Sequence, residues 1–296
     1  MPGSDSDDKT LTWRQLLAET ETALGDRNHA RWMCEVASGC DADEFRGLLG
    51  EPARTRMVAH LDAMIARRRG GEPLQYVLGR WQFRTLDLMV DRRVLIPRPE
   101  TEWVAEAALV AARSAREHAH GRVLRIVDLG TGSGALGLSL AAELPIGSAE
   151  VWLVDVASDA LDVARANLAG LGRAGAAVRI AQGSWFEPLP AELRGAVDLV
   201  VANPPYIAVG DAAVDPSVAD WEPHIALFAG DDGMRDIRTI ATGAATWLRS
   251  GGTLVMEIGM TQGAAVAAIL TAAGFRQVEI RPDLAGLDRI AIGVAR

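Results

Sequence analysis

The sequence contains only two cysteines, Cys34 and Cys40, among its 296 residues. No histidine stands near them at a spacing typical of metal ligands, so the pattern predicts neither a disulfide framework nor a zinc site, and we expect no bound metal. Long apolar runs are also missing. Because a membrane-spanning helix needs roughly 18 or more uninterrupted apolar residues, the sequence predicts no transmembrane segment.

The first ten residues carry three aspartates and no apolar stretch. This composition excludes a secretory signal and disfavours an arginine-rich transit peptide. We therefore interpret Met1 to Thr10 as a frayed tail and expect a cytoplasmic protein.

The chain has few positive charges for its size, with a net charge of −9, and most of the acidic excess lies beyond residue 120. Such a surface repels phosphate backbones unless it carries a local basic patch, so nucleic acid is a disfavoured substrate. The basic cluster of Arg67, Arg68 and Arg69 ends a predicted helix. We interpret it as a solvated helix end that complements the helix dipole, in preference to a binding patch.

The spacing of apolar residues predicts a purely helical region from Thr12 to about Arg69, and Gly70, Gly71 and Pro73 then mark a hinge. A hairpin region and a helix from about Glu100 to His118 follow. We expect short strands at Gln75 to Leu78, Trp81 to Phe83 and Leu86 to Val90. The predicted organisation is a helical domain (1–72) for substrate recognition, a hairpin linker (73–98) and a catalytic domain (99–296).

From Arg122 onward the pattern is that of buried strands alternating with helices, which predicts a mainly parallel sheet covered on both faces. Helical stretches are expected between the first five strands, whereas the last two lack such a connection and should pair antiparallel at the edge. The fold class is therefore α/β, with a seven-stranded Rossmann-like sheet and a small N-terminal helical domain. The predicted strands are Leu124 to Asp128, Val151 to Val156, Val178 to Gln182, Val197 to Ala202, Thr253 to Ile258, Gln277 to Arg281 and Arg289 to Ala295.

A glycine-rich turn follows the first of these strands and opens a helix from Ala135 to Glu143. Glycines allow a sharp turn and a close approach to a ligand, while the helix start offers free N–H groups. A dinucleotide fingerprint would place its third glycine at position 135, so NAD-linked redox chemistry is disfavoured. The spacing instead resembles the D-x-G-x-G-x-G turn of methyltransferases, with Asp128 facing the ammonium group of the cofactor. The turn reads Asp128-Leu129-Gly130-Thr131-Gly132-Ser133-Gly134.

Two further residues are candidates for cofactor contacts. Asp155 ends the second strand, where a carboxylate can accept hydrogen bonds from both ribose hydroxyls. An aspartate in this position also serves as a helix N-cap. Trp185 follows the third strand and offers a flat face for adenine, although tryptophans more often only pack.

The most specific motif is Asn203-Pro204-Pro205-Tyr206, directly after the fourth strand. Two prolines fix the turn and remove two backbone donors, so the turn presents carbonyl acceptors, and the asparagine adds a side-chain oxygen. Two acceptors that hold an amide NH2 group orient its delocalised lone pair toward a methyl donor. We expect Asn203 Oδ1 and the Pro204 carbonyl to hold the amide while Tyr206 packs against it, in a direct displacement without a tuned general base.

Taken together, these motifs resemble the peptide chain release factor glutamine methyltransferases, often called HemK or PrmC. The resemblance covers nearly the whole chain, and the segment before the glycine turn is its narrowest signature. It rests on Pro73-Leu74-Gln75-Tyr76 with Gly79, Ile96-Pro97-Arg98-Pro99-Glu100-Thr101-Glu102, the glycine turn, Asn203 to Tyr206, Glu222-Pro223, Gly251-Gly252, Glu257-Ile258-Gly259 and Asp283 to Arg289.

The resemblance implies that S-adenosylmethionine is the cofactor, with S-adenosylhomocysteine as its product. It implies cofactor contacts from Gly130, Thr131, Gly132, Ser133 and Gly134, from Asp155 and Trp185, and from Asn203. Substrate contacts are implied at Asn203, Pro204, Pro205 and Tyr206. The implied substrate is the glutamine of a Gly-Gly-Gln tripeptide in class I release factors, which would give the enzyme a role in translation termination.

Three alternatives remain open from the residues. An amino-methylase acting on adenine or guanine in DNA or ribosomal RNA would show a steep salt dependence of substrate binding. A ribosomal protein glutamine is another possible substrate. A non-catalytic binding module is disfavoured by the intact Asn-Pro-Pro-Tyr motif.

Overall fold

The computed structural model describes residues 11–211 and 215–296, so the tail predicted at Met1 to Thr10 lies outside the described residues. The chain divides into two compact units, Met1–Gly79 and Arg80–Arg296. No helix in the described part of the chain is both long and apolar enough to cross a membrane.

The first unit is helical, as its apolar spacing predicts. Its helices have well-formed ends: Thr12 and Gln15 form a capping box at the first helix, and Gly25 ends that helix in the left-handed conformation. Trp13, Phe45 and other buried side chains form its core. The helices are α1 (Trp13–Leu24), α2 (Arg27–Ser38), α3 (Ala42–Leu48), α4 (Thr55–Arg69) and α5 (Leu74–Leu78).

One prediction for this unit is corrected by the structure. The segment Gln75 to Leu78 is not a strand but most of α5. At the end of α4, Arg67 and Arg69 are exposed, as predicted for a solvated helix end. Arg67 donates from Nε and Nη2 to the carboxylate of Glu72, at 2.8 and 2.7 Å, and from Nη2 to the Tyr76 carbonyl at 2.8 Å. Arg67 therefore joins α4 to α5.

The second unit begins with an antiparallel hairpin of β1 (Arg80–Phe83) and β2 (Leu86–Met89), as predicted, followed by α6 (Pro99–Glu117). Its main sheet has seven strands in the order β5-β4-β3-β6-β7-β9-β8. The α/β fold class is thereby confirmed. The strands are β3 (Leu124–Leu129), β4 (Ala149–Asp155), β5 (Val178–Gln182), β6 (Val197–Ala202), β7 (Leu248–Glu257), β8 (Arg276–Pro282) and β9 (Asp288–Val294).

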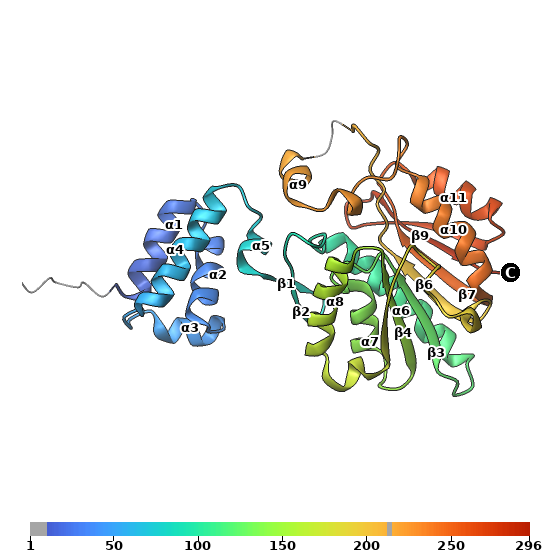
Figure 1. Cartoon of the computed structure of the whole chain (residues 1–296), viewed down its shortest axis with the longest axis horizontal. Coiled ribbons are helices and arrows are strands. Elements are labelled where there is room, and N and C mark those ends of the chain that lie inside the picture. The colour runs from blue at the N-terminus through green and yellow to red at the C-terminus, as the bar shows by residue number, and fades with distance from the viewer. Residues whose placement is uncertain (1–10, 212–214) are drawn as a thin grey trace, which may run out of the picture. The chain divides into compact units, whose positions relative to one another are not determined.

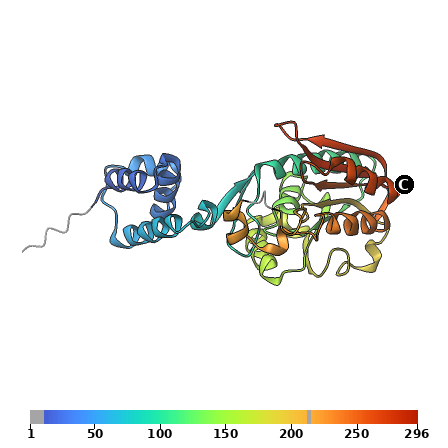
Figure 2. The same ribbon diagram turned by 90° about the horizontal axis from the view of Figure 1, so that it is seen from above.

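The order of the strands explains why helices cover both faces of the sheet (Figures 1 and 2). From β3 the chain moves outward through β4 to β5, and it then returns to β6 on the other side of β3. Because parallel crossovers are right-handed, this reversal places later helices on the opposite face. The remaining helices are α7 (Ala135–Glu143), α8 (Ser158–Gly170), α9 (Pro216–Trp221), α10 (Arg235–Trp247) and α11 (Gly263–Ala272).

The sheet differs from the prediction in one detail. Between β5 and β6 the only helical segment is a three-residue 3-10 helix, Ala191–Leu193, so a full helix does not separate these strands. The last two strands, β8 and β9, pair antiparallel at the edge of the sheet, as predicted. Strand β9 runs against the others and lies between β7 and the edge strand β8.

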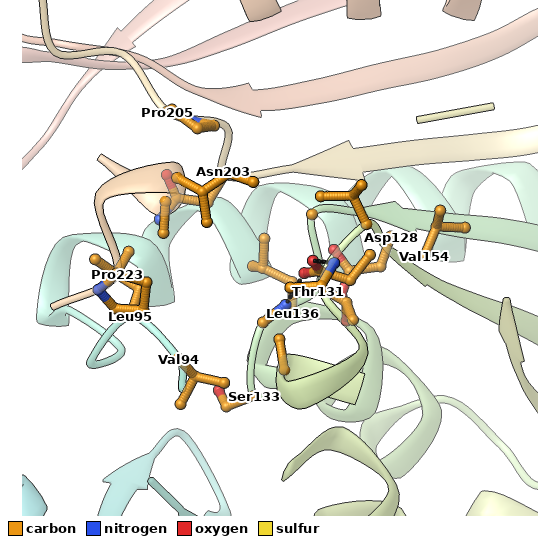
Figure 3. Close-up of a pocket in the computed structure, with 18 of the residues that line it drawn as sticks. Val94, Leu95, Asp128, Thr131, Ser133, Leu136, Val154, Asn203, Pro205 and Pro223 are labelled. Carbon is orange, nitrogen blue, oxygen red and sulfur yellow. Dashed lines mark hydrogen bonds between the residues drawn. The ribbon is translucent and has the colours of Figure 1, made fainter. Parts of the chain in front are cut away.

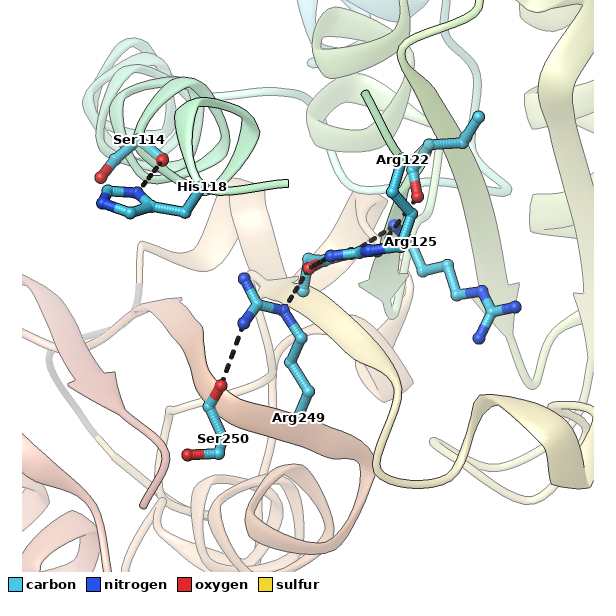
Figure 4. A network of polar contacts seen from close by, with 8 residues as sticks. Ser114, His118, Arg122, Arg125, Arg249 and Ser250 are labelled. Carbon is cyan, nitrogen blue, oxygen red and sulfur yellow. Dashed lines mark hydrogen bonds and ion pairs between the residues drawn. The ribbon is translucent and has the colours of Figure 1, made fainter. Parts of the chain in front are cut away.

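The buried carboxylate of Asp198, near the start of β6, connects the beginnings of neighbouring strands. Asp198 accepts hydrogen bonds from Arg122, at 2.7 and 2.8 Å, from the backbone N–H of Arg125 at 2.8 Å, and from Arg249. These donors hold the pKa of Asp198 below its usual value despite its burial. Arg122 precedes β3 and Arg249 belongs to β7. Their guanidinium groups meet at Asp198, as Figure 4 shows.

Candidate functional site

A cavity of about 320 Å³ lies where the carboxyl ends of β3, β4 and β6 meet. This is the point at which the strand order reverses, and such points form the ligand crevice of open α/β sheets. In Figure 3, Asp128 and Thr131 lie on one side of the cavity, and Asn203 and Pro205 lie on the other. The sheet topology therefore brings the glycine turn and the Asn-Pro-Pro-Tyr motif, predicted separately, to one cavity.

Asp128 is almost completely buried at the end of β3. Its Oδ2 accepts hydrogen bonds from Thr131 Oγ1 at 2.6 Å and from the backbone N–H of Gly137 at 2.9 Å. Its Oδ1 has no partner among the described residues. Burial raises the pKa of Asp128 to about 6. A buried carboxylate oxygen without a partner is costly, so this atom fits a donor supplied by a ligand, such as an ammonium group.

The glycine turn has the backbone conformation that its composition predicts. Gly130, Gly132 and Gly134 all have positive φ, between 55° and 88°, which side chains strongly disfavour. A Cβ atom at position 130 would lie 3.5 Å from the ring of Trp185, which is an ordinary contact distance. Trp185 itself lines the cavity and has a φ of 47°. The indole and the turn therefore meet at the cavity wall.

Asp155 lines the same cavity from the end of β4. Its Oδ2 accepts a hydrogen bond from Gly132 and its Oδ1 accepts one from Ala157, both from backbone N–H groups at 2.9 Å. Burial raises the pKa of Asp155, while these N–H groups lower it. The carboxylate thus links the glycine turn to the start of α8.

The four residues of the Asn-Pro-Pro-Tyr motif do not share one role in the geometry. Asn203 and Pro205 line the cavity, whereas Pro204 and Tyr206 do not. Asn203 donates from Nδ2 to Thr101 Oγ1 at 3.3 Å. The hydroxyl of Tyr206 donates to Glu257 Oε1 at 3.2 Å. The tyrosine side chain is therefore held by a buried carboxylate of β7.

Glu222 has a structural role that the sequence reasoning did not assign. It is buried and accepts a hydrogen bond from the backbone N–H of Ile96 at 3.0 Å and another from Arg98. These bonds hold the segment before α6 beside the loop that follows β6. Leu95 and Pro97 of that segment line the cavity. The pairing joins the segment Ile96 to Glu102 to the Glu222-Pro223 motif. Because Ile96 and Glu222 lie 126 positions apart, no local pattern in the sequence indicates their contact.

Asn167 of α8, which was not predicted as a site residue, holds part of the cavity wall in place. Its Oδ1 accepts from the backbone N–H of Met89 at 2.7 Å, and its Nδ2 donates to the carbonyls of Ser133 and Met89, at 2.8 and 3.1 Å. The side chain is buried. One amide therefore fastens the glycine turn to strand β2.

We expect Asn167→Leu to lower the free energy of unfolding by about 3 kcal/mol, because the buried carbonyl of Ser133 and the part-buried N–H of Met89 lose their partner. Chemical denaturation measures this loss. Ala166→Leu, which places the same side chain at an exposed neighbouring position, should change stability by less than about 0.5 kcal/mol. A loss below about 1 kcal/mol at position 167 would contradict the fastening role.

No three His, Cys, Asp or Glu side chains within residues 11–211 and 215–296 come together in a way that could hold a metal ion. Cys34 and Cys40 are free thiols.

Comparison with known proteins gives two family matches. The model for the methyltransferase small domain matches residues 108–219, and the model for the PrmC N-terminal domain matches residues 12–79. The cavity residues Asp128, Asp155 and Asn203 fall within the first match.

Curated relatives cover most of the chain. A release factor glutamine methyltransferase from Neisseria gonorrhoeae is 44% identical over 245 residues, which are 82% of this chain and 84% of the relative. One from Gloeobacter violaceus is 39% identical over 290 residues, 96% of each chain. Among solved structures, the hMettl16 catalytic domain in complex with the MAT2A 3'UTR hairpin 6 has a TM-score of 0.53 at 14% identity, covering 83% of this chain and 84% of that one. This last likeness concerns the fold alone.

Proposed function

This chain belongs to the release factor glutamine methyltransferase family, and from that membership and the cavity at the carboxyl ends of β3, β4 and β6 we propose its function. It methylates the side-chain amide nitrogen of the glutamine in the Gly-Gly-Gln tripeptide of a class I peptide chain release factor. The observation that carries the proposal is the position of Asn203, which lines the same cavity as Asp128 and Asp155. A release factor substrate implies a cytoplasmic enzyme.

The cavity is proposed to hold S-adenosylmethionine. This cofactor supplies a methyl group bonded to a positively charged sulfur. Asp128 is suited to its ammonium group because Oδ1 is buried without a protein partner. Asp155 is proposed to accept hydrogen bonds from the ribose hydroxyls, and Trp185 to cover the adenine. The turn from Gly130 to Gly134 would contact the methionine part through its backbone.

The substrate amide is proposed to lie against the Asn-Pro-Pro-Tyr turn. Asn203 Oδ1 and the Pro204 carbonyl accept hydrogen bonds from the two N–H bonds of the glutamine NH2 group, which directs the nitrogen lone pair toward the methyl group. Pro205 completes the rigid turn. Pro204 and Tyr206 do not line the cavity, and the contact of each with the glutamine stays a proposal. A methylated amide nitrogen that carries an extra proton is very acidic, so the proton leaves to water without a tuned base.

We expect Asp155→Ala to raise the Kd of S-adenosylmethionine about tenfold or more, because hydrogen bonds to two ribose hydroxyls are lost. The variant also removes the acceptor for the backbone N–H groups of Gly132 and Ala157. A cofactor analogue without ribose hydroxyls separates the two effects: wild type and variant should bind that analogue with similar affinity. An unchanged Kd for the full cofactor would leave Asp155 with a purely structural role.

The substrate class is tested by offering labelled cofactor with three acceptors: a class I release factor, ribosomal proteins, and RNA or DNA. Label should enter the release factor. Label in nucleic acid, with transfer that falls steeply as salt rises, would support an amino-methylase of nucleic acid instead.

A further inference from the structure

Glu257 is a buried carboxylate that does not itself line the cavity. It ends β7 and is 1% exposed. Its Oε2 accepts a hydrogen bond from Thr101 Oγ1 at 2.6 Å, and its Oε1 accepts one from the Tyr206 hydroxyl at 3.2 Å. Burying a carboxylate costs free energy unless hydrogen bonds compensate it. Two hydroxyl donors, brought from α6 and from the Asn-Pro-Pro-Tyr turn, fulfil that requirement here.

The carboxylate also decides the direction of the next hydrogen bond. An ionised carboxylate only accepts, and a threonine hydroxyl has a single proton, so Thr101 donates that proton to Glu257. The Thr101 oxygen can then only accept. Its donor is the Nδ2 group of Asn203, at 3.3 Å. Glu257, Thr101 and Asn203 therefore form a chain of hydrogen bonds with one defined direction.

This direction matters because the two ends of an asparagine amide have nearly the same shape and opposite hydrogen-bonding character. With Nδ2 directed at Thr101, the Oδ1 acceptor is left for the cavity that Asn203 lines. Rotated by half a turn, the side chain would present its NH2 group to the NH2 group of a substrate amide. Two donors would then face each other, and the substrate could not be held.

We propose that Thr101 and Glu257 are positioning residues, which fix the Asn203 side chain with its oxygen toward the substrate amide. The proposal rests on the proposed function, in which Asn203 holds the glutamine amide. Thr101 also lines the cavity, whereas Glu257 does not. In the proposed role both residues act through Asn203.

Protonation of Glu257 would reverse the chain. A carboxylic acid can donate to Thr101, and Thr101 can then donate to Asn203 Oδ1, which turns Nδ2 toward the cavity. Burial and the charge of Glu100 on α6 raise the pKa of Glu257, while the hydroxyls of Thr101 and Tyr206 and the charge of Arg289 on β9 lower it, and the net result is a pKa of about 7. The carboxylate prevails above this pH and the acid below it. Methyl transfer should therefore decline as the pH falls below about 7.

The test uses the full chain with S-adenosylmethionine and a class I release factor. Thr101→Val keeps the shape of the side chain and removes the hydroxyl, so kcat should fall about 100-fold, the scale expected for a misplaced catalytic contact. The Kd of the cofactor should change little. Thr101→Ser returns the hydroxyl and should restore most of kcat. Thr242→Val is the matched control, because that hydroxyl only bonds the Arg238 carbonyl on α10, and its kcat should equal that of wild type.

Two further measurements separate positioning from packing. Glu257→Gln replaces the ionisable carboxylate by an amide that does not titrate and whose oxygen can still accept from Thr101, so kcat should fall less than in Thr101→Val. In both variants the decline of kcat toward acid pH should disappear. A Thr101→Val enzyme with nearly wild-type kcat, or a Thr101→Ser enzyme as impaired as Thr101→Val, would overturn the proposal. If the wild-type enzyme leaves the release factor unmethylated, the proposed function is wrong. This outcome differs from the two results for the Thr101 variants, which test only the positioning role.

Discussion

Asn203→Ala should abolish measurable methyl transfer to a release factor while the protein still binds S-adenosylmethionine. The variant loses the Oδ1 acceptor for the substrate amide and the donor to Thr101. Because transfer depends on orienting a poor nucleophile, we expect kcat to fall by about 100-fold or more. Rapid quantification of methylated release factor under saturating cofactor measures the loss.

Cofactor binding provides the control for this variant. Asp128, Asp155 and the glycine turn are unchanged, so calorimetric titration should find binding weakened but present. A variant that keeps more than about a tenth of the wild-type rate has lost less than about 1.4 kcal/mol of transition-state stabilisation. Such a small loss would exclude the amide-holding role of Asn203.

Removing the helical unit, residues 1–79, should separate substrate recognition from chemistry. The residues that line the cavity begin at Arg93, beyond the helical unit, and a single glutamine side chain offers few contacts. A folded release factor therefore requires a second contact surface, which we propose the N-terminal helices provide. We expect kcat/KM for the intact release factor to fall about 100-fold, which corresponds to about 2.7 kcal/mol of lost contacts.

A short Gly-Gly-Gln peptide is the matched substrate for this comparison, because it cannot reach a surface distant from the tripeptide. Its kcat/KM should change far less than that of the protein. The truncated enzyme must first be shown to be folded and to bind the cofactor near wild-type affinity. Equal losses on peptide and protein would contradict this division of labour.

The strands of the sheet could be predicted because burial on both faces requires continuous apolar runs. Val197–Ala202, in which every residue is buried, begins and ends where the sequence places it. Gln75 to Leu78 was assigned wrongly because so few residues cannot distinguish a strand period from a helix period. Pro73 before the segment and Gly79 after it, in the left-handed conformation, are signals that favour the helix.

The candidate site could be predicted only where its residues follow strand ends in local motifs. The glycine turn, Asp155 and Asn203 are of this kind, and the order of strands brings them together. Thr101 and Glu257 lie 156 positions apart, and neither has a local pattern that indicates a partner. Their contact depends on α6 packing beside the end of β7, which no spacing within the sequence reveals.

Mass spectrometry of a class I release factor, incubated with this enzyme and S-adenosylmethionine, tests the proposed activity most directly. Fragmentation should place the mass of one methyl group on the side chain of the Gly-Gly-Gln glutamine, with none when Asn203→Ala replaces the wild-type enzyme. A release factor that stays unmodified while another protein or a nucleic acid gains the methyl group would contradict the proposed function.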